Sequence, residues 1–164
     1  MLIRTAAMSD LDEICRVESI CFPPSEAATR ESFEERLSFY PNHFHLLFIE
    51  NRLVSFTDGF VTDDKDLSDE MYEHACLHNE KGAWQMIFGV NTLPEHRKKG
   101  YAGLLIKEMI RTAALEKRCG LVLTCKDALV PFYSRFGFVN EGVSASVHGN
   151  VSWNQMRYTF LKSL

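Results

Sequence analysis

The sequence has 164 residues, of which 46% are hydrophobic, and this size fits one domain around one substantial core. Its 18 basic and 22 acidic residues give a formal net charge of -4, so neither nucleic acid nor an anionic membrane surface is an expected partner. The 5 cysteines include no Cys-x-x-Cys pair, which argues against a disulfide framework and against a zinc ribbon.

A membrane-spanning helix needs roughly 18 consecutive apolar residues, and no run in the sequence approaches that length. The stretch 1–13 turns acidic where a secretory signal stays apolar. We therefore expect a cytoplasmic protein that forms a single domain over residues 1–164 and acts as a monomer or a homodimer. Its expected partner is a small molecule.

The first half of the chain predicts a strand, two helices and a hairpin. Apolar residues recur at helical spacing behind Ser9 and Asp10, which offer a cap, and Thr29 precedes a second amphipathic stretch. The elements expected are a strand at 2–5, helices at 11–21 and 31–39, strands at 45–50 and 53–61 joined at residues 51–52, and an acidic loop at 62–81 with one short helix near 67–78.

The second half alternates strands with helices. A run of large apolar residues leads into a basic, glycine-bearing turn and then into a long amphipathic helix. The elements expected are a strand at 83–91, the basic turn at 94–101, a helix at 102–116, a strand at 121–125, a short helix at 129–136, a strand entered at 138–139 and a last strand near 151–161.

The basic turn has the chemistry of an anion site. The first N–H groups of a helix have no partner inside it, and glycines let the backbone approach a phosphate closely. Pyrophosphate is the ligand that this pattern favours. The pattern Arg/Gln-x-x-Gly-x-Gly/Ala is present, and the residues expected to bind are Arg97, Lys98, Lys99, Gly100, Tyr101, Ala102 and Gly103.

A second motif is more specific. Residues 125–138 read Cys-Lys-Asp-Ala-Leu-Val-Pro-Phe-Tyr-Ser-Arg-Phe-Gly-Phe, which resembles the GNAT N-acetyltransferases, where a short helix carries a tyrosine before Gly-Phe. Within that family the string is most similar to the arylalkylamine N-acetyltransferases. The resemblance continues more weakly through residues 22–24 and 52–56.

The resemblance implies an α/β fold of mixed α+β character, the GNAT fold, with a mixed central sheet flanked by helices. It implies acetyl-CoA as cosubstrate and no metal, and a splay between the strands that end near residues 90 and 125, where pantetheine lies. By position, Phe88, Gly89 and Val90 offer backbone contacts to pantetheine. The implied reaction is direct acetyl transfer to a primary amine, with a small arylalkylamine-like acceptor.

A free alkylamine, with a pKa of about 10, must lose a proton before it attacks a thioester. Two histidines are implicated in vertebrate relatives, but the matching positions here hold Trp84 and Met86, which cannot act as bases. Insect relatives use a glutamate just after the first helix, so we expect Glu26 to accept the proton. The alternatives that stay open are a water chain or His43, His45, Glu70 or His148.

Tyr133 matches the family tyrosine that can protonate the departing coenzyme A thiolate; its alternative role is packing among aromatic neighbours. Phe22, Pro23 and Pro24 are expected to form an apolar wall for the acceptor, unless they are an ordinary turn. Two further functions remain possible. One is a GNAT that acts on a protein N-terminus, a lysine, a polyamine or an antibiotic, and the other is a CoA-binding module without turnover.

Overall fold

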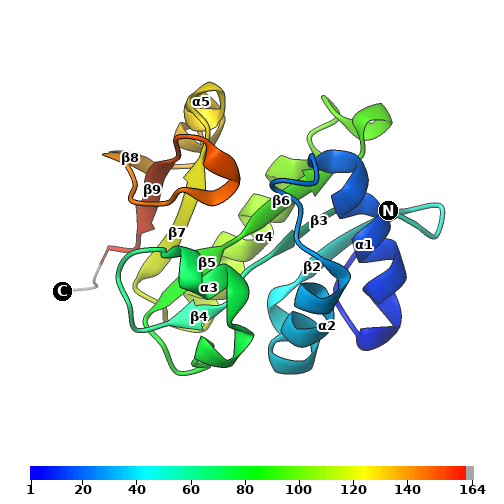
Figure 1. Ribbon diagram of the computed structural model, residues 1–164, viewed down its shortest axis with the longest axis horizontal. Coiled ribbons are helices and arrows are strands. Elements are labelled where there is room, and N and C mark those ends of the chain that lie inside the picture. The colour runs from blue at the N-terminus through cyan, green and yellow to red at the C-terminus, as the bar shows by residue number, and fades with distance from the viewer. Residues whose placement is uncertain (162–164) are drawn as a thin grey trace.

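The computed structural model describes residues 1–161, so residues 162–164 of the expected domain lie outside the described part. Its strands form two sheets that diverge from a common edge (Figure 1). The first sheet has the order β1-β2-β3-β6 and the second has the order β4-β5-β7-β9-β8. The strands are β1 (Leu2–Thr5), β2 (His45–Ile49), β3 (Arg52–Asp58), β4 (Val61–Thr62), β5 (Trp84–Ile87), β6 (Gly89–Thr92), β7 (Gly120–Cys125), β8 (Val139–Val143) and β9 (Asn154–Thr159).

The apolar run at 83–91 is not one strand, as the sequence predicted, because it breaks at Phe88. β5 pairs in parallel with β7, whereas β6 pairs antiparallel with β3 in the other sheet. The N–H of Phe88 donates to the carbonyl of Asp58 at 2.7 Å, so the chain crosses between the sheets without leaving that donor unpaired. The two sheets therefore separate directly after this residue.

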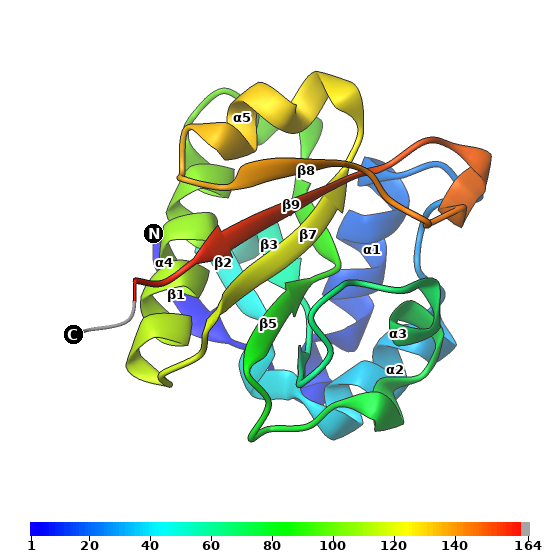
Figure 2. The ribbon, with the colours of Figure 1, turned by 90° about the vertical axis from the view of Figure 1, so that its left-hand side faces the viewer.

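Helices cover both faces of the sheets, and Figure 2 shows α4 (Tyr101–Leu115) on one side and α1 (Leu11–Cys21) and α2 (Arg30–Phe39) on the other. On α1 the buried positions include Ile14 and Val17, which share the stripe that the helical spacing predicted. Thr29 caps α2, since its hydroxyl accepts the N–H of Ser32 at 3.1 Å. The buried apolar residues form two clusters: one joins α1 and α2 to both sheets and includes Leu105 of α4, and the other packs the rest of the buried stripe of α4 against the second sheet.

The hairpin between β2 and β3 turns one residue earlier than the sequence predicted. Glu50 and Asn51 occupy the turn with φ values of 49° and 63°. A two-residue turn with positive φ at both positions matches the right-handed twist of the flanking strands. β3 then ends at Asp58 rather than at residue 61, because Val61 belongs to β4 in the second sheet.

The remaining elements agree with the predicted order. The short helices are α3 (Asp69–Glu73), inside the acidic loop, and α5 (Val130–Ser134), which carries the Pro-Phe-Tyr segment. All 5 cysteines are free thiols. No helix in the described part of the chain combines the length and the apolar character needed to cross a membrane.

Candidate functional site

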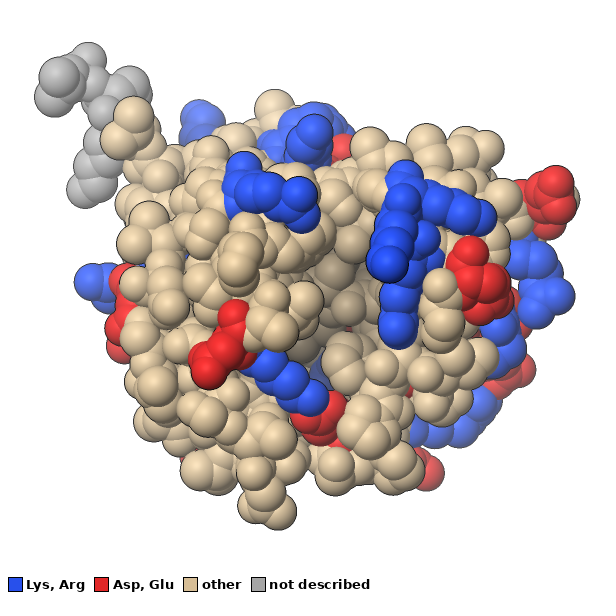
Figure 3. All heavy atoms as spheres, turned by 90° about the horizontal axis from the view of Figure 1, so that it is seen from above, with Lys and Arg blue, Asp and Glu red and all other residues tan. Residues whose placement is uncertain are grey.

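A cavity of about 840 Å³ lies where the two sheets diverge. Its lining comes from both sheets, from all five α-helices, and from the loops between α1 and α2 and between β8 and β9. Figure 3 shows a hollow on this face with Lys and Arg side chains along its margins. Its lining includes Ile87, Phe88 and Gly89, at the break between β5 and β6, and Leu123 of β7.

One end of the cavity is formed by the basic turn and α5. Arg97 and Ala102 line it together with Val90, Leu129 and Phe132. Gly100 has a φ of 85°, in the left-handed region that favours glycine, and it precedes the first residue of α4. The first intrahelical bond runs from the N–H of Leu104 to the carbonyl of Gly100, so the N–H groups of the helix start are available to an anion.

The predicted cofactor residues divide into those that line the cavity and those that lie beside it. Phe88, Gly89, Val90, Arg97 and Ala102 line it. The others follow the turn on the outer side of the helix start, with Lys98, Lys99 and Gly100 exposed and Tyr101 and Gly103 half-buried.

Gly103 has a packing role that the sequence did not indicate. A Cβ there would lie 3.0 Å from the Cζ of Phe136, which is closer than normal contact allows. The missing side chain therefore lets α4 approach the segment that follows α5. This contact places the start of α4 against the segment that directly follows the helix carrying Tyr133.

Tyr133 lies on α5 and its side chain lines the cavity. It packs edge to face against Phe132 and Phe138, and the Cys125 thiol faces it. Burial raises the pKa of Tyr133 above its ordinary value, and a charge on Cys125 would raise it further. The side chain therefore remains a phenol at neutral pH and can donate a hydrogen bond into the cavity.

The other end of the cavity has aromatic walls. Phe22, Tyr72 and Trp153 line it, and the ring of His148 stacks on Tyr72 with 5.3 Å between centroids. Pro23 and Pro24 are exposed and lie outside the lining, so the structure brings only Phe22 of the three predicted wall residues to the cavity. Both prolines belong to the turn that positions the next acidic residue.

Glu26 is buried and its carboxylate lies in the lining. Its backbone N–H donates to the Pro23 carbonyl at 2.9 Å, which fixes the turn. Oε1 forms an ion pair with the Nζ of Lys126 at 2.7 Å, while Oε2 has no hydrogen-bond partner among the described residues. His148 Nε2 lies 2.9 Å from the Glu26 carbonyl, and because a carbonyl can only accept, this nitrogen carries a hydrogen.

The other candidate bases from the sequence differ in whether they line the cavity. His148 lines the cavity, whereas His43, His45 and Glu70 lie outside the lining. Burial lowers the pKa of His45 to about 4, so its imidazole is neutral at physiological pH. Met86, at one of the positions where vertebrate relatives have histidine, is fully buried in the core.

Three charged residues of the lining were not identified from the sequence. Arg36 and Asp58 form a buried ion pair at 2.8 Å, and Arg36 also donates to the Tyr72 carbonyl at 2.9 Å. Glu18 is the third, and it lies on the buried stripe of α1 with Val17. A carboxylate on an otherwise apolar helical stripe was the signal that could have found it.

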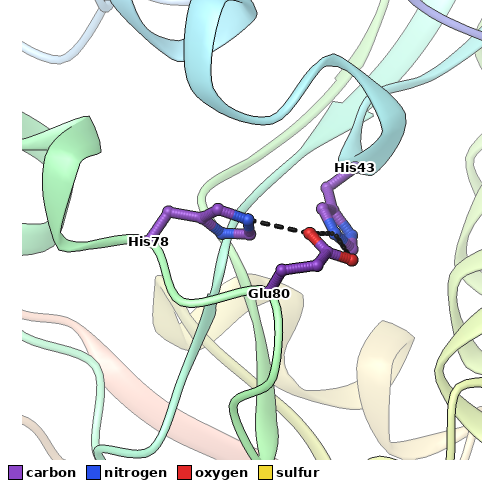
Figure 4. A group of neighbouring side chains, drawn as sticks. All are labelled: His43, His78 and Glu80. Atoms are coloured by element: carbon purple, nitrogen blue, oxygen red, sulfur yellow. Dashed lines mark hydrogen bonds and ion pairs between the residues drawn. The ribbon is translucent and has the colours of Figure 1, made fainter.

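A separate cluster joins His43, His78 and Glu80, away from the cavity (Figure 4). His78 Nδ1 accepts the N–H of Val61 at 3.1 Å, so its Nε2 carries the hydrogen that faces Glu80 at 2.8 Å. A metal would need the lone pair of that nitrogen. Arg118 also pairs with Glu80, at 3.3 Å, so the donor set fits a hydrogen-bond network better than a metal centre.

Comparisons with known proteins agree with this geometry. The chain is 29% identical over 111 residues to the serotonin N-acetyltransferase of Mesocricetus auratus, a match that covers 67% of this chain and 52% of that enzyme. It thus matches about half the length of that relative. Among solved structures, the GphF GNAT-like decarboxylase in complex with isobutyryl-CoA superposes with a TM-score of 0.84 at 20% identity, covering 97% of this chain and 99% of that one.

A third relative is the ribosomal-protein-S18-alanine N-acetyltransferase from Escherichia coli, with a TM-score of 0.74 at 12% identity over 99% of this chain and 95% of that one. At these identities the two structures show a shared fold. Residues 11–138 match the Acetyltransferase (GNAT) family. With the strand splay, the glycine-capped helix start and the tyrosine helix around one cavity, this match establishes that the chain belongs to the GNAT acetyltransferase family.

Proposed function

We propose that this chain transfers the acetyl group of acetyl-CoA directly to a primary amine, with a small arylalkylamine as acceptor. The observation that carries the proposal is a single cavity with a basic, glycine-bearing helix start at one end and aromatic and acidic side chains at the other. Arg97 and the start of α4 suit the pyrophosphate, and the strand residues Gly89 and Val90 suit pantetheine. Acetyl-CoA and the amine would thus meet between the sheets.

The acceptor end favours an aromatic amine for two reasons. Phe22, Tyr72 and Trp153 provide apolar surface for an aryl group, and the carboxylates of Glu18 and Glu26 provide negative charge for an ammonium. The serotonin N-acetyltransferase relative supports the same acceptor class.

The reaction requires one proton acceptor and one donor at different places. The amine reaches the site as an ammonium and must give up a proton, and we propose that a carboxylate of the acceptor end takes it. Glu26 is the residue that the sequence indicates, and its Oε2 is free among the described residues. Tyr133, held as a phenol, would donate a hydrogen bond to the sulfur as the thiolate leaves. Because its raised pKa makes full proton transfer less favourable, hydrogen-bond donation is its main contribution.

The test is thiol release from acetyl-CoA with a panel of amines: phenethylamine, tryptamine, spermidine, a lysine peptide and an aminoglycoside. We expect the highest kcat/KM for phenethylamine or tryptamine, with the acetylated product confirmed by mass spectrometry. A preference for spermidine, the peptide or the aminoglycoside would show that the acceptor is one used by another class of GNAT enzyme. Tight acetyl-CoA binding without transfer to any amine would instead identify a CoA-binding module.

A further inference from the structure

Glu18 is a buried residue that lines the cavity, and its carboxyl group makes few hydrogen bonds. The residue is 6% exposed, and Oε1 accepts one hydrogen bond, from the N–H of Ala28 at 3.3 Å. Oε2 has no partner in the part of the chain that the structure describes. A buried carboxylate normally has its lone pairs satisfied, so an oxygen without a partner on a residue that lines a cavity indicates a ligand.

The neighbouring amide interacts only weakly with this carboxyl group. Asn91, on β6, lowers the pKa of Glu18 by approaching it, but neither its oxygen nor its nitrogen makes a hydrogen bond of normal geometry among the described residues. Gly89 lies close to both polar groups, because a Cβ at that position would come within 3.2 Å of the Asn91 nitrogen and 3.0 Å of an Asp58 oxygen. The Glu18 carboxyl group and the Asn91 amide therefore lie together next to the strand expected to contact pantetheine.

The charges around Glu18 leave its carboxylate uncompensated. Asp58 is engaged with Arg36, so that pair brings no net positive charge to Glu18. The thiols of Cys15 and Cys21, on the same helix, are the other titratable groups that interact with it. Burial, reinforced by the Asp58 charge, raises the pKa of Glu18 to about 7. A proton acceptor works best when its pKa is near the working pH.

Glu26 differs from Glu18 in that its carboxylate already forms an ion pair. Its Oε1 is 2.7 Å from the Lys126 ammonium, and a proton on this carboxylate would cost the ion pair. A proton on Glu18 instead removes an uncompensated buried charge.

On these grounds we propose that Glu18 binds the ammonium of the acceptor and takes its proton, while Glu26 positions the loop between α1 and α2. This inference rests on the proposed acetyl transfer. The ammonium gives one proton to Glu18 and becomes a neutral amine, whose nitrogen attacks the thioester carbon as the C–S bond breaks. The second proton of the nitrogen ends on the sulfur, which accepts a hydrogen bond from Tyr133 as it leaves, and Glu18 returns its proton to solvent.

The experiment compares wild type with Glu18→Gln and Glu26→Gln, which remove the charge at nearly constant size. Glu13→Gln is the matched control, because Glu13 lies on the same helix outside the cavity lining. With the best amine of the panel, Glu18→Gln should lower kcat/KM at pH 7 by about 10²-fold or more and recover as the pH approaches about 10, where solvent supplies neutral amine. Glu26→Gln should show a loss without that recovery.

A binding measurement gives an answer that does not depend on turnover. Calorimetry with phenethylamine and the protein–CoA complex should show about tenfold tighter binding at pH 8 than at pH 6 in wild type, and no such change in Glu18→Gln. The role of Glu18 would be overturned if wild type and Glu18→Gln showed parallel pH profiles and equal amine affinities. It would also be overturned if kcat/KM recovered at high pH in Glu26→Gln but not in Glu18→Gln. If amine binding follows Glu18 but no acetyl is transferred, the proposed function fails and the binding role of Glu18 stands; if no panel amine binds or reacts, both are overturned.

Discussion

The Nζ of Lys126 lies 2.7 Å from the Oε1 of Glu26, and this ion pair joins the end of β7 to the loop between α1 and α2. The two residues belong to different sides of the strand splay, and Glu26 and the neighbour of Lys126, Cys125, both line the cavity. His148 adds a second link through the Glu26 carbonyl at 2.9 Å. The loop that carries Glu26 is therefore held to the second sheet at two points.

Breaking this link should affect the acceptor more than the cofactor. We expect Lys126→Met to raise KM for the amine by about tenfold, since a misplaced wall weakens binding, while the Kd for acetyl-CoA stays within about twofold. Steady-state kinetics and calorimetry measure the two quantities. Lys117→Met, at an exposed position outside the cavity lining, is the control. An equal loss of affinity for both substrates would show that the pair organises the whole site.

Gly100→Glu should strongly weaken acetyl-CoA binding. The variant places a carboxylate beside the expected pyrophosphate and forces a side chain into a φ of 85°. Gly142→Glu is a matched control, because Gly142 has a φ of 95°, has nothing within 4 Å of its Cβ position and lies on β8. We expect about 10²-fold or greater loss of affinity for Gly100→Glu. An affinity like that of the Gly142 variant, measured by calorimetry on folded protein, would remove the turn from the cofactor site.

Tyr133→Phe keeps the ring that packs against Phe132 and Phe138 and removes the hydroxyl. We expect kcat to fall by about 10²–10⁴-fold, the range for one acid-base group, with acetyl-CoA affinity nearly unchanged. Because the pKa of Tyr133 is raised by burial, no loss of activity from its ionisation should be visible below pH 10. Turnover at the wild-type rate, with chemistry shown to limit it, would leave Tyr133 a packing residue.

Glu18 should make the protein less stable as the pH rises. Its folded pKa of about 7 exceeds its ordinary value of 4.5, so between these values the folded state holds a proton that the unfolded state has lost. Stability therefore falls from about pH 4.5 to pH 7, by an amount on the order of 3 kcal/mol.

Glu18→Gln removes this dependence. Its Tm should equal that of wild type near pH 4.5 and exceed it at pH 8 by roughly 5–10 °C, given the size of the chain. Thermal melts across this range, followed by circular dichroism, measure the difference. A constant Tm difference between the two proteins would mean that Glu18 titrates in the folded state as it does in the unfolded chain.

Much of the fold could be predicted because its signals are local. The stripe of α1, the Thr29 cap and the glycine before α4 each depend on residues within a few positions. The break at Phe88 could not be predicted, since the apolar pattern is continuous while the hydrogen-bond partners change from β7 to β3. These partners come from distant parts of the sequence.

The site was predicted unevenly for the same reason. Arg97 and Tyr133 lie within motifs, so their sequence neighbours indicated them. The pairing of Lys126 with Glu26 joins segments far apart in the chain and left no local pattern. Glu18 was visible as one polar position on a buried helix face, but its open oxygen depends on Asn91 and Ala28 and required coordinates.

The chain crosses between the sheets twice at one corner, through Gly59 and Phe60 after β3 and through Phe88 after β5. A Cβ on Gly59 would lie 1.8 Å from the carbonyl oxygen of Met86, so the two crossings touch and allow no side chain between them. The two sheets are therefore in direct backbone contact at this corner. Elsewhere they are connected through the ion pair of Lys126 and the hydrogen bond of His148, both with Glu26. A side chain at Gly59 would force the two crossings apart, and in the proposed reaction the distance between the thioester and the amine would then change even though neither binding end had been altered.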